Sequence, residues 1–574
     1  MSDTPFPAFA SARRLPNLFD LVAGTLILAA LVYVAGVARG TALRLDAPEI
    51  TVTLDPWNLP EYAVRTTLRM FAALACSLLF TLTYATWAAK SRRAGLVLIP
   101  VLDILQSVPI LGFLTFTVVF FLRLFPGQVV GAELAAIFAI FTSQAWNMAF
   151  SLYQALKTVP ADLDEASRSL NLSGWQRFWR LEVPFAMPGL VWNTMMSMSG
   201  GWFFVVASEA ITVGDTTWKL PGIGSYVSLA LDQRDIGAVL WAIFAMLFVI
   251  LAYDQLLFRP LVAWSAKFRF EIIASEQAED PWLLKLLRRT RWLRVMSSTL
   301  GDFFNWFGGV RVFRARGRRD TVARAPSRLG DAVFLAVLLA AVGYAAWEIV
   351  QFVSGTLTWE DLGTAVELGL ITLVRVVVLM TLATLVWVPI GVWLGLRPKW
   401  GRRIQPLAQF LAAFPANLFF PVFVVVIVKY SLNWDVALTP LMILGTQWYI
   451  LFNVIAGASA FPGDLQEAAR SLQVGGWLWW RRVILPGIFP YYVTGAITAS
   501  GGSWNAAIVS EVASWGSAKL EAHGLGAYIA QATAAGDTAK VVLGVAVMSS
   551  FVIAFNRLLW RPLYAFANRR LTLG

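Results

Sequence analysis

One charged stretch occurs twice in this sequence: Pro160-Ala-Asp-Leu-Asp-Glu165-Ala-Ser-Arg168-Ser-Leu170-Asn-Leu-Ser-Gly174 and Pro462-Gly-Asp-Leu-Gln-Glu467-Ala-Ala-Arg470-Ser-Leu472-Gln-Val-Gly-Gly476. Because 467 − 165 = 302, Glu467 lies 302 residues after Glu165, and this offset relates every matching pair in the two copies. Both copies are polar segments between long apolar ones, so hydrophobic burial does not explain them. A membrane protein that presents such a helix twice on one side is expected to present it to a two-fold partner.

The composition is that of an integral membrane protein. Of the 574 residues, 58% are hydrophobic and 14% are charged, with a mean hydropathy of +0.66, whereas soluble domains are about a quarter charged. The net charge of +12 indicates basic loops held at anionic lipid and argues against nucleic-acid binding. With one cysteine, Cys76, and one histidine, His523, the sequence predicts neither an intrachain disulfide nor a metal or haem site.

About 20 apolar residues cross a bilayer as a helix, and the sequence predicts two sets of six such spans. The first set is 18–37, 67–89, 97–122, 134–156, 185–213 and 236–257. The second set is 332–353, 369–396, 407–428, 436–460, 488–513 and 541–559. The predicted fold is an all-α integral membrane protein with about 12 transmembrane helices in two tandem, parallel six-helix repeats. Because the fifth span of each set is rich in proline, a broken helix is an alternative there.

The duplication extends well beyond the charged stretch. In the second and third spans the offset is 306, which relates Thr66 to Thr372, Arg69 to Arg375, Gly95 to Gly401, Pro100 to Pro406 and Pro109 to Pro415. From the fourth span onward it is 302, which relates Trp146 to Trp448, Gly200 to Gly502, Trp202 to Trp504, Glu209 to Glu511, Gly222 to Gly524 and Gly224 to Gly526. Chance apolar similarity would not align Gly, Pro, Trp and charged residues together, so the chain is a tandem duplication.

The duplication divides the chain into a first repeat at 1–260, a linker at 261–328 and a second repeat at 329–574. The linker is basic, and its residues Trp282, Leu283, Leu286, Leu287 and Trp292 predict an amphipathic helix on the membrane surface. Two roles are open for the linker: a basic tether that fixes the topology, or a specific docking or regulatory element.

The distribution of Lys and Arg predicts the orientation. With six spans in each half, the basic residues of the short loops and the linker gather on one side, which is predicted to be the cytoplasm. Both termini and both charged stretches then lie in the cytoplasm, and the Gly222 and Gly524 loops face outward.

The duplicated stretch resembles the EAA loop of ABC importer permeases of the type I fold. Glu467-Ala468-Ala469 with Gly476 matches that pattern fully, and Glu165-Ala166-Ser167 with Gly174 matches with one substitution. The stretches Ser208-Glu209-Ala210…Gly222-Ile-Gly224 and Ser510-Glu511-Val512…Gly524-Leu-Gly526 are similar to the nitrate, sulfonate and taurine branch. In that family each polypeptide usually supplies one half, whereas here the two halves are fused.

The resemblance implies two coupling helices that contact separate ATPase subunits through Glu165, Ala166, Arg168, Gly174, Glu467, Ala468, Arg470 and Gly476. The Gly would permit the tight turn after each helix, and Pro184 and Pro486 would limit where the fifth spans begin. The alternative is that acid–base pairs such as Glu165 with Arg168 only stabilise a loop helix.

The resemblance also implies partners and a location. These are two cytoplasmic ABC ATPase subunits that bind ATP and Mg, a periplasmic or lipid-anchored solute-binding protein, membrane lipid, and the bacterial inner membrane. The sequence contains no G-x-x-x-x-G-K-[ST] phosphate loop, so the chain is expected to bind no cofactor and not to be the ATPase itself.

The predicted function is therefore the permease subunit of an ATP-driven importer, and by resemblance the solute is a small anion such as nitrate, sulfonate or bicarbonate. Phosphonate, methionine and quaternary amines are further solute classes that remain open. The competing class is a secondary transporter with two parallel repeats, which would need no ATPase and usually carries ionisable residues near mid-membrane.

Each half carries one charge of each sign at a similar predicted depth in the membrane. Since an ionised side chain there is costly unless it is paired or faces protein or water, the sequence predicts the pairs Arg69–Glu209 and Arg375–Glu511 near an outer gate. These pairs could be a static lock, a gate that breaks during transport, or solute contacts.

The fifth spans carry runs of small residues that end at Trp202 and Trp504. The runs either permit close helix packing or line a narrow path along the pseudo-two-fold axis. Asn147, Asn193 and Asn505 are further polar candidates for that path.

Overall fold

The computed structural model describes residues 51–213, 216–268, 328–459, 461–515 and 518–570, parts of the linker at 299, 301–303 and 305–310, and isolated positions between 25 and 36. Most of the predicted first span and the whole predicted amphipathic helix at 282–292 lie outside the described residues. The chain divides into two compact units. Residues 1–38, 159–188 and 254–318 form the first, and residues 39–158, 189–253 and 319–574 form the second.

The described part of the chain is helical apart from two short hairpins. The helical elements of the first half are η3 (Pro56–Asn58), α2 (Leu59–Lys90), α3 (Arg92–Ser107), α4 (Ile110–Leu124), α5 (Val129–Lys157), α6 (Ala161–Ser169), α7 (Gly174–Arg177), η4 (Phe178–Glu182), α8 (Val183–Glu209), α9 (Ile223–Asp232), α10 (Ile236–Tyr253), η5 (Asp254–Phe258), α11 (Arg259–Ser265) and η6 (Ala266–Phe268).

The second half repeats this order. Its helical elements are α14 (Arg328–Ser354), α15 (Trp359–Gly395), α16 (Pro398–Ala413), η7 (Ala416–Leu418), α17 (Phe420–Lys429), α18 (Trp434–Ala437), α19 (Leu441–Leu444), α20 (Trp448–Ser459), α21 (Gly463–Ser471), α22 (Gly476–Trp479), η8 (Trp480–Ile484), α23 (Leu485–Ser510), α24 (Leu525–Ala534), α25 (Thr538–Phe555), η9 (Asn556–Trp560) and α26 (Arg561–Arg570).

The predicted all-α, multi-pass fold is confirmed. Seven described helices are long and apolar enough to cross a membrane, or eight if the bent pair Trp434–Leu444 and Trp448–Ser459 counts as one span. Within the described ranges, three other predicted spans are divided into shorter helices: the third span of each half, and the fourth span of the second half, where the continuous helix predicted at 436–460 is wrong because the chain forms α18, α19 and α20.

The third span of each half is broken at a proline. In the first half Val108 has ψ 128° before Pro109, and in the second half Phe414 has ψ 128° before Pro415. A residue that precedes proline is pushed out of the α region by the proline ring, which ends the helix. The two prolines were recognised as a repeated pair, but the continuous spans predicted at 97–122 and 407–428 are wrong at these positions.

The fifth span of each half is continuous, as predicted, so the alternative of a helix broken at its prolines does not hold. The helices α7 and α22 lead into α8 and α23 through the π-helical turns η4 and η8. The prediction that Pro184 and Pro486 limit where the fifth-span helices begin agrees with the structure, because α8 begins at Val183 and α23 at Leu485, each one residue before its proline. A π-helical turn just before each proline accommodates the hydrogen bond that the proline cannot make.

A short antiparallel hairpin follows the fifth span in each half. Strand β1 (Ala210–Val213) pairs with β2 (Thr216–Lys219) in the register Ala210 to Lys219, and β3 (Val512–Trp515) pairs with β4 (Ala518–Glu521) in the register Val512 to Glu521. The hairpins return the chain to the end of α8 and α23, where α9 and α24 begin.

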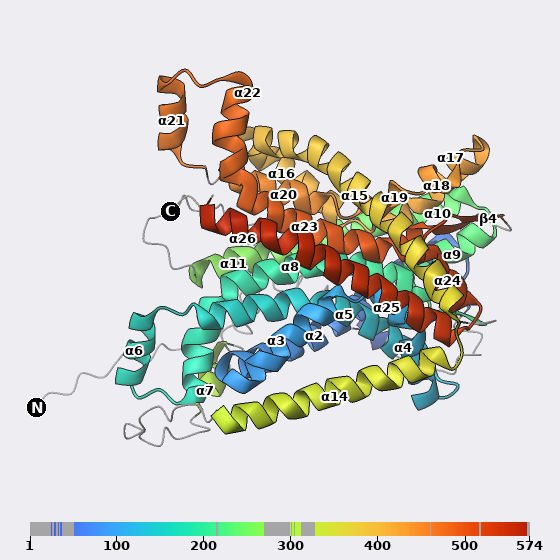
Figure 1. Ribbon diagram of the computed structural model, residues 1–574, viewed down its shortest axis with the longest axis horizontal. Coiled ribbons are helices and arrows are strands. Elements are labelled where there is room, and N and C mark those ends of the chain that lie inside the picture. Colours follow the sequence, from blue (N-terminus) through green and yellow to red (C-terminus); the bar gives the residue numbers. More distant parts are fainter. Residues whose placement is uncertain are drawn as a thin grey trace, which may run out of the picture. The chain divides into compact units, whose positions relative to one another are not determined.

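The two halves interlock within the second unit. Helices α15, α20 and α23 lie side by side (Figure 1) and contribute most of the main apolar core, which also contains Ile110 and Leu114 of α4. Helix α4 of the first half packs against α23 and α25 of the second, and α10 of the first half packs against α16 and α17. Since α4 and α17 are matching elements, as are α25 and α10, the exchange is reciprocal.

The break in the third span exposes a backbone amide that a side chain of the other half satisfies. The Ile110 amide, at the start of α4, donates to Asn505 Oδ1 of α23 at 2.7 Å. Non-helical backbone at membrane depth is tolerated only where its polar groups are paired or line a cavity. Asn505 therefore holds the break in α3–α4 against the fifth span of the second half.

Asn505→Ala is expected to lower the melting temperature of the detergent-solubilised chain. An unsatisfied buried amide costs about 1–3 kcal/mol. The control is Asn453→Ala, which removes an amide that donates only to the Tyr449 carbonyl one turn back in its own helix. Size-exclusion melting curves measure both, and equal curves for the two variants would contradict this role of Asn505.

Candidate functional site

The duplicated charged stretch forms two matching short helices, α6 and α21, which follow Pro160 and Pro462. All eight residues predicted to contact a partner are exposed. Leu170 and Leu472, at the ends of the helices, are 73% and 76% exposed. Large apolar side chains exposed at the same position of both copies, beside carboxylates, are typical of a surface that a protein partner covers.

The turn after each helix is made by a residue other than glycine. Asn171 and Gln473 adopt positive φ angles of 51° and 53°. The Leu172 amide then donates to the Ser167 carbonyl at 3.1 Å, and the Val474 amide donates to the Ala469 carbonyl at 2.8 Å. This is a Schellman motif. The prediction that Gly174 and Gly476 make this turn is wrong, because both begin the next helix, but Gly476 does so with a positive φ of 57°, a conformation that favours glycine.

Acid–base pairs are present in the first copy, with a partner other than the one predicted. Arg168 pairs with Asp164 at 2.6 Å, and Arg177 pairs with Asp164 and with Glu182 at 2.5 and 3.1 Å. The helix is therefore stabilised by Asp164, while Glu165 stays exposed. In the second copy the positions that match Asp164, Arg177 and Glu182 are Gln466, Trp479 and Ile484.

Part of the linker docks on the segment that follows α6. Trp175 Nε1 donates to the Phe307 carbonyl at 2.8 Å, and Gln176 Nε2 donates to the Gly309 carbonyl at 2.9 Å. The Phe307 ring also packs edge-on against Trp175, with ring centroids 5.0 Å apart. The matching residue of the second copy, Trp477, is 73% exposed. Residues 307–309 therefore support the docking alternative for the linker, at the first copy.

The predicted pair Arg69–Glu209 is confirmed as the centre of a larger buried cluster. Arg69 donates to Glu209 Oε1 at 2.7 Å and, through two nitrogens, to Glu133 at 2.5 and 2.7 Å. The Thr66 hydroxyl also donates to Glu209 at 2.6 Å. The Gly224 amide at the start of α9 donates to Glu209 Oε2 at 2.6 Å. One guanidinium thus joins α2, α5, α8 and α9.

The predicted pair Arg375–Glu511 is confirmed in a cluster of the same design. Arg375 donates to Glu511 at 3.1 Å and to Asp435 at 2.9 Å. The Thr372 hydroxyl donates to Glu511 at 3.0 Å. Asp435 also accepts from the backbone amide of His523 at 2.7 Å. The side chain of Asp435 is 40% exposed, whereas that of Glu133 is 9% exposed, so the second cluster is closer to solvent.

The close packing in these clusters explains why the first position of each Gly-x-Gly motif is glycine. A Cβ atom added at Gly222 would collide with the carboxylate of Glu209, and one added at Gly524 would collide with that of Glu511. The backbone can approach each carboxylate closely enough to donate to it only because these positions lack a side chain.

Sequence reasoning missed the second carboxylate of each cluster. Glu133 and Asp435 are separated by 435 − 133 = 302 residues, the same offset that relates the other pairs. The signal was weak because the two residues differ in type and begin a span instead of lying within one. Aligning acidic residues by charge class at that offset would have found them.

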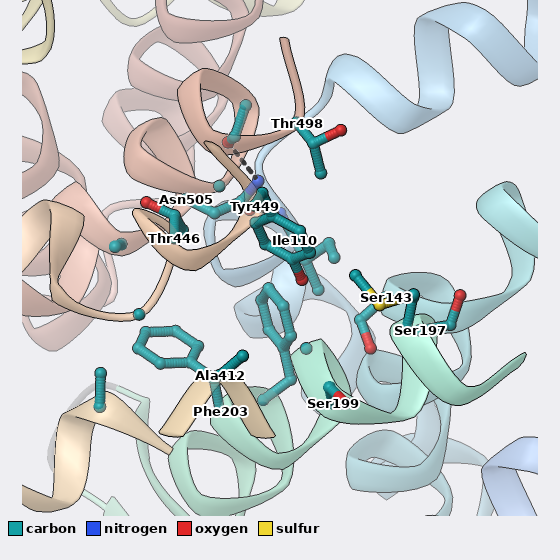
Figure 2. A pocket seen from close by; sticks show the side chains of 18 of the residues that line it. Ile110, Ser143, Ser197, Ser199, Phe203, Ala412, Thr446, Tyr449, Thr498 and Asn505 are labelled. Atoms are coloured by element: carbon teal, nitrogen blue, oxygen red, sulfur yellow. Dashed lines mark hydrogen bonds between the residues drawn. The ribbon is translucent and has the colours of Figure 1, made fainter. Parts of the chain in front are cut away.

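A cavity of about 190 Å³ lies inside the second unit, between helices of both halves. Figure 2 shows Ser143, Ser197 and Ser199 from the first half, and Thr446, Tyr449, Thr498 and Asn505 from the second half, around this space. No described lining residue is Asp, Glu, Lys or Arg. Among the described residues there is also no cluster of His, Cys, Asp and Glu that could hold a metal ion.

The lining of the cavity is built from matching positions of the two repeats. Nine pairs of matching positions both line it: Gln106 and Ala412, Ile110 and Ala416, Ser143 and Gly445, Asn147 and Tyr449, Met196 and Thr498, Ser199 and Gly501, Gly200 and Gly502, Phe203 and Asn505, and Phe204 and Ala506. The cavity therefore lies on the pseudo-two-fold axis, yet most pairs differ in size or polarity.

The remaining path candidates divide between this lining and the packed interior. Asn147, Asn505, Gly200 and Gly502 line the cavity, whereas Asn193 bonds to Ser151 and is not part of the described lining. Trp202 and Trp504 are fully buried outside it, where they pack against Tyr253 and Phe551. The small-residue runs thus serve both the packing of helices and the cavity.

Arg69→Met is expected to destabilise the chain more than Arg375→Met. Without Arg69, Glu133 and Glu209 are left buried without a cation, and breaking a buried ion pair costs about 3–5 kcal/mol, whereas Asp435 retains solvent contact. Melting curves in detergent measure the difference. Arg65→Met, which removes the i,i+4 partner of the half-exposed Glu61, is the control and should change little. Equal melting of the Arg69→Met and Arg65→Met proteins would contradict a structural role for the cluster.

The chain is similar in sequence to several transport permeases. The chain shares 29% identity over 141 residues with the bicarbonate transport system permease protein CmpB of Synechococcus elongatus, covering 25% of this chain and 49% of the relative. It shares 28% over 204 residues with the glycine betaine/proline betaine transport system permease protein ProW of Escherichia coli, covering 36% and 52%. With the nitrate import permease protein NrtB of Synechococcus elongatus it shares 26% over 207 residues, covering 35% and 70%. For the first two, the matched region is about half of the relative's length.

A family model matches the chain twice. The model of the binding-protein-dependent transport system inner membrane component matches residues 67–258 and 388–570, one match in each half and together more than half of the chain. Each match contains one of the exposed charged helices, and the first also contains Arg69, Glu133 and Glu209, whereas the second contains Asp435 and Glu511 but begins after Arg375. This chain is therefore a member of the family of binding-protein-dependent transport system inner membrane components, with two family domains in one polypeptide.

Proposed function

We propose that this chain is the complete permease of an ATP-driven importer, in which one polypeptide supplies both halves of the solute path. The observation that carries the proposal is the pair of exposed helices α6 and α21, which present Glu165 and Glu467 and the leucines Leu170 and Leu472 at matching positions. Two equal surfaces fit two equal ATPase subunits, which would supply ATP and Mg. The cavity on the pseudo-two-fold axis would be the space through which the solute passes.

The location and the other partner follow from the same proposal. The membrane is the bacterial inner membrane, with both termini and the two helices in the cytoplasm, as the excess of Lys and Arg in those loops favours. A solute-binding protein on the opposite side, periplasmic or lipid-anchored, would deliver the solute at the ends of α8 and α23, where the hairpins lie.

The alternative of a secondary transporter has less support. Such a protein usually carries ionisable groups near the solute site that bind the coupling ion. Among the described residues, the buried charges other than Glu182, which pairs with Arg177, belong to the two clusters at the hairpins, and the described cavity lining contains no Asp, Glu, Lys, Arg or His.

The cavity favours a small anion as the solute. Its amide groups, on Gln106, Asn147 and Asn505, can donate hydrogen bonds to a compact oxyanion, whereas the hydroxyls of Ser143 and Thr498 donate to backbone carbonyls one turn back. A site that holds an anion by neutral donors alone binds it weakly, which suits a path that the solute must leave. A quaternary amine is the second candidate, because the rings of Trp146, Phe203, Phe204, Phe414 and Tyr449 also line the cavity and could hold a cation by cation–π contact.

Glu165→Ala and Glu467→Ala are each expected to reduce solute-stimulated ATP hydrolysis by about tenfold or more. The reason is that a charge-assisted hydrogen bond contributes about 1.5–3 kcal/mol. The measurement uses the chain purified with the ATPase subunits that it captures, reconstituted in proteoliposomes. Asp162→Ala and Asp464→Ala, which remove the same charge from the same helices, are the matched controls. Solute uptake by vesicles that lack ATP would contradict the importer and favour secondary transport.

For an anion, Asn147→Ala is expected to lower the uptake rate about tenfold, since one hydrogen bond to a charged solute is lost, while Phe204→Ala changes little. For a quaternary amine, Phe204→Ala should instead lower the uptake rate, because an aromatic ring that contacts the cation is lost, and Asn147→Ala should change it little. Uptake of labelled nitrate, bicarbonate and glycine betaine into proteoliposomes separates the two. Asn193→Ala, from the same membrane region but outside the lining, is the control. If neither cavity variant alters uptake of any solute, the cavity is not on the path.

A further inference from the structure

A second cavity, of about 410 Å³, lies where the end of α15 meets α21 and η8. Arg397 and Arg470 line it, together with the indole rings of Trp393, Trp479 and Trp480. No described lining residue is acidic. Two guanidinium groups in one aromatic-walled cavity, with no carboxylate in its described lining, form a site that is complementary to an anion.

The first copy of the loop carries a different charge at the matching positions. There Arg168, which matches Arg470, pairs with Asp164 at 2.6 Å. In the second copy Gln466 stands at the position of Asp164, since 164 + 302 = 466, so the arginine is kept while its carboxylate is lost. Arg397 stands at the position of Ser91, since 91 + 306 = 397, which adds a second cation. The second copy therefore has an amide where the first has an acid, and a base where the first has a serine.

The Arg397 side chain is held in place for binding. Its guanidinium carbon lies 4.7 Å from the centre of the Trp393 ring, and that ring packs against Trp400 with centroids 5.9 Å apart. Stacking on an indole face fixes the plane of a guanidinium and leaves its N–H edge available, which is the geometry that phosphate oxygens accept in pairs.

The apolar surface beside the cavity indicates which phosphate compound fits. Leu382, Val386, Ile390 and Trp393 are exposed on α15 at spacings of three and four residues, so they form one stripe. The stripe runs along a predicted membrane span and ends at Arg397, one turn beyond Trp393. Tryptophan is typical of the membrane interface, and basic pockets between membrane helices bind anionic lipid head groups.

We propose that this cavity binds the phosphate head group of one anionic phospholipid between Arg397 and Arg470, with the acyl chains along the exposed stripe of α15. The lipid phosphate then takes the place that the Asp164 carboxylate has beside Arg168 in the first copy. Helix α21 is held by a lipid, whereas α6 is held by its own side chains and is followed by the docking site of the linker. This inference needs the chain to lie in a membrane, but it does not depend on the solute or on the ATPase.

The test counts lipids retained by the purified full chain in native mass spectrometry. The chain is incubated in detergent with phosphatidylglycerol or with phosphatidylcholine. Two variants install the residues of the first copy: Arg397→Ser removes the added cation, and Gln466→Asp restores the acid beside Arg470. Arg403→Ser, which removes an exposed cation from α16 outside the described cavity lining, is the matched control. Melting curves establish that all variants are folded.

We expect the unchanged chain and the Arg403→Ser variant to retain one phosphatidylglycerol molecule and no phosphatidylcholine. Retention should fall about tenfold or more in the Arg397→Ser and Gln466→Asp variants, because a charge-assisted contact is lost or displaced. Labelled inorganic phosphate is the second arm. If it binds with the same dependence on Arg397 and Gln466 while lipid does not, the phosphate site is supported and its lipid source is overturned. Equal retention of phosphatidylglycerol by all four proteins overturns the proposal.

Discussion

The arrangement of this protein depends on two buried arginines, each of which bridges two carboxylates. Arg69 joins Glu133 to Glu209, and Arg375 joins Asp435 to Glu511. A buried charge is tolerated only when it is paired and hydrogen-bonded, so these contacts fix the ends of several helices at one point. The same carboxylates accept the backbone amides that begin α9 and α24, and their closeness explains why Gly222 and Gly524 carry no side chain. The ends of the helices that line the central cavity are thereby held in register.

The geometry of these clusters also distinguishes between two roles for the Arg–Glu pairs, a static lock and a gate that breaks during transport. A gate that opens during transport would have to break the bonds of Arg69 to two carboxylates and a carbonyl, and then leave those groups buried. The free-energy cost of breaking a single buried ion pair is already about 3–5 kcal/mol. The geometry therefore favours a lock in the first half. In the second half Asp435 is partly exposed and also accepts a hydrogen bond from His523, so that cluster has a further partner and is more accessible to solvent.

Much of this structure could be predicted from the sequence because duplication supplies an internal comparison. Two offsets were enough to align the Arg–Glu pairs, the Gly-x-Gly motifs and the EAA helices without any relative. The predictions failed where backbone geometry depends on tertiary partners. The break before Pro109 is stabilised by Asn505, which lies 395 residues away, and the turn after α6 uses Asn171 because its bonds go back to the helix. The paired carboxylates Glu133 and Asp435 were missed because they differ in type. The cavity was only partly predictable, since its lining depends on which face of each helix turns inward.

The two halves are alike where they would contact identical ATPase subunits and differ where they would contact the solute. Two ATPase subunits of one kind would require the same chemistry twice, and Glu165, Leu170 and Arg168 have counterparts of the same type in the second copy. A solute has no two-fold symmetry, and the matched cavity positions have diverged to pairs such as Asn147 with Tyr449 and Phe203 with Asn505. Other positions of the two loops have diverged, so that residues after the first helix contact the linker and residues around the second line the basic cavity of the proposed lipid site. Fusion into one chain permits this divergence, because each half meets only one partner half and a change on one side need not suit both.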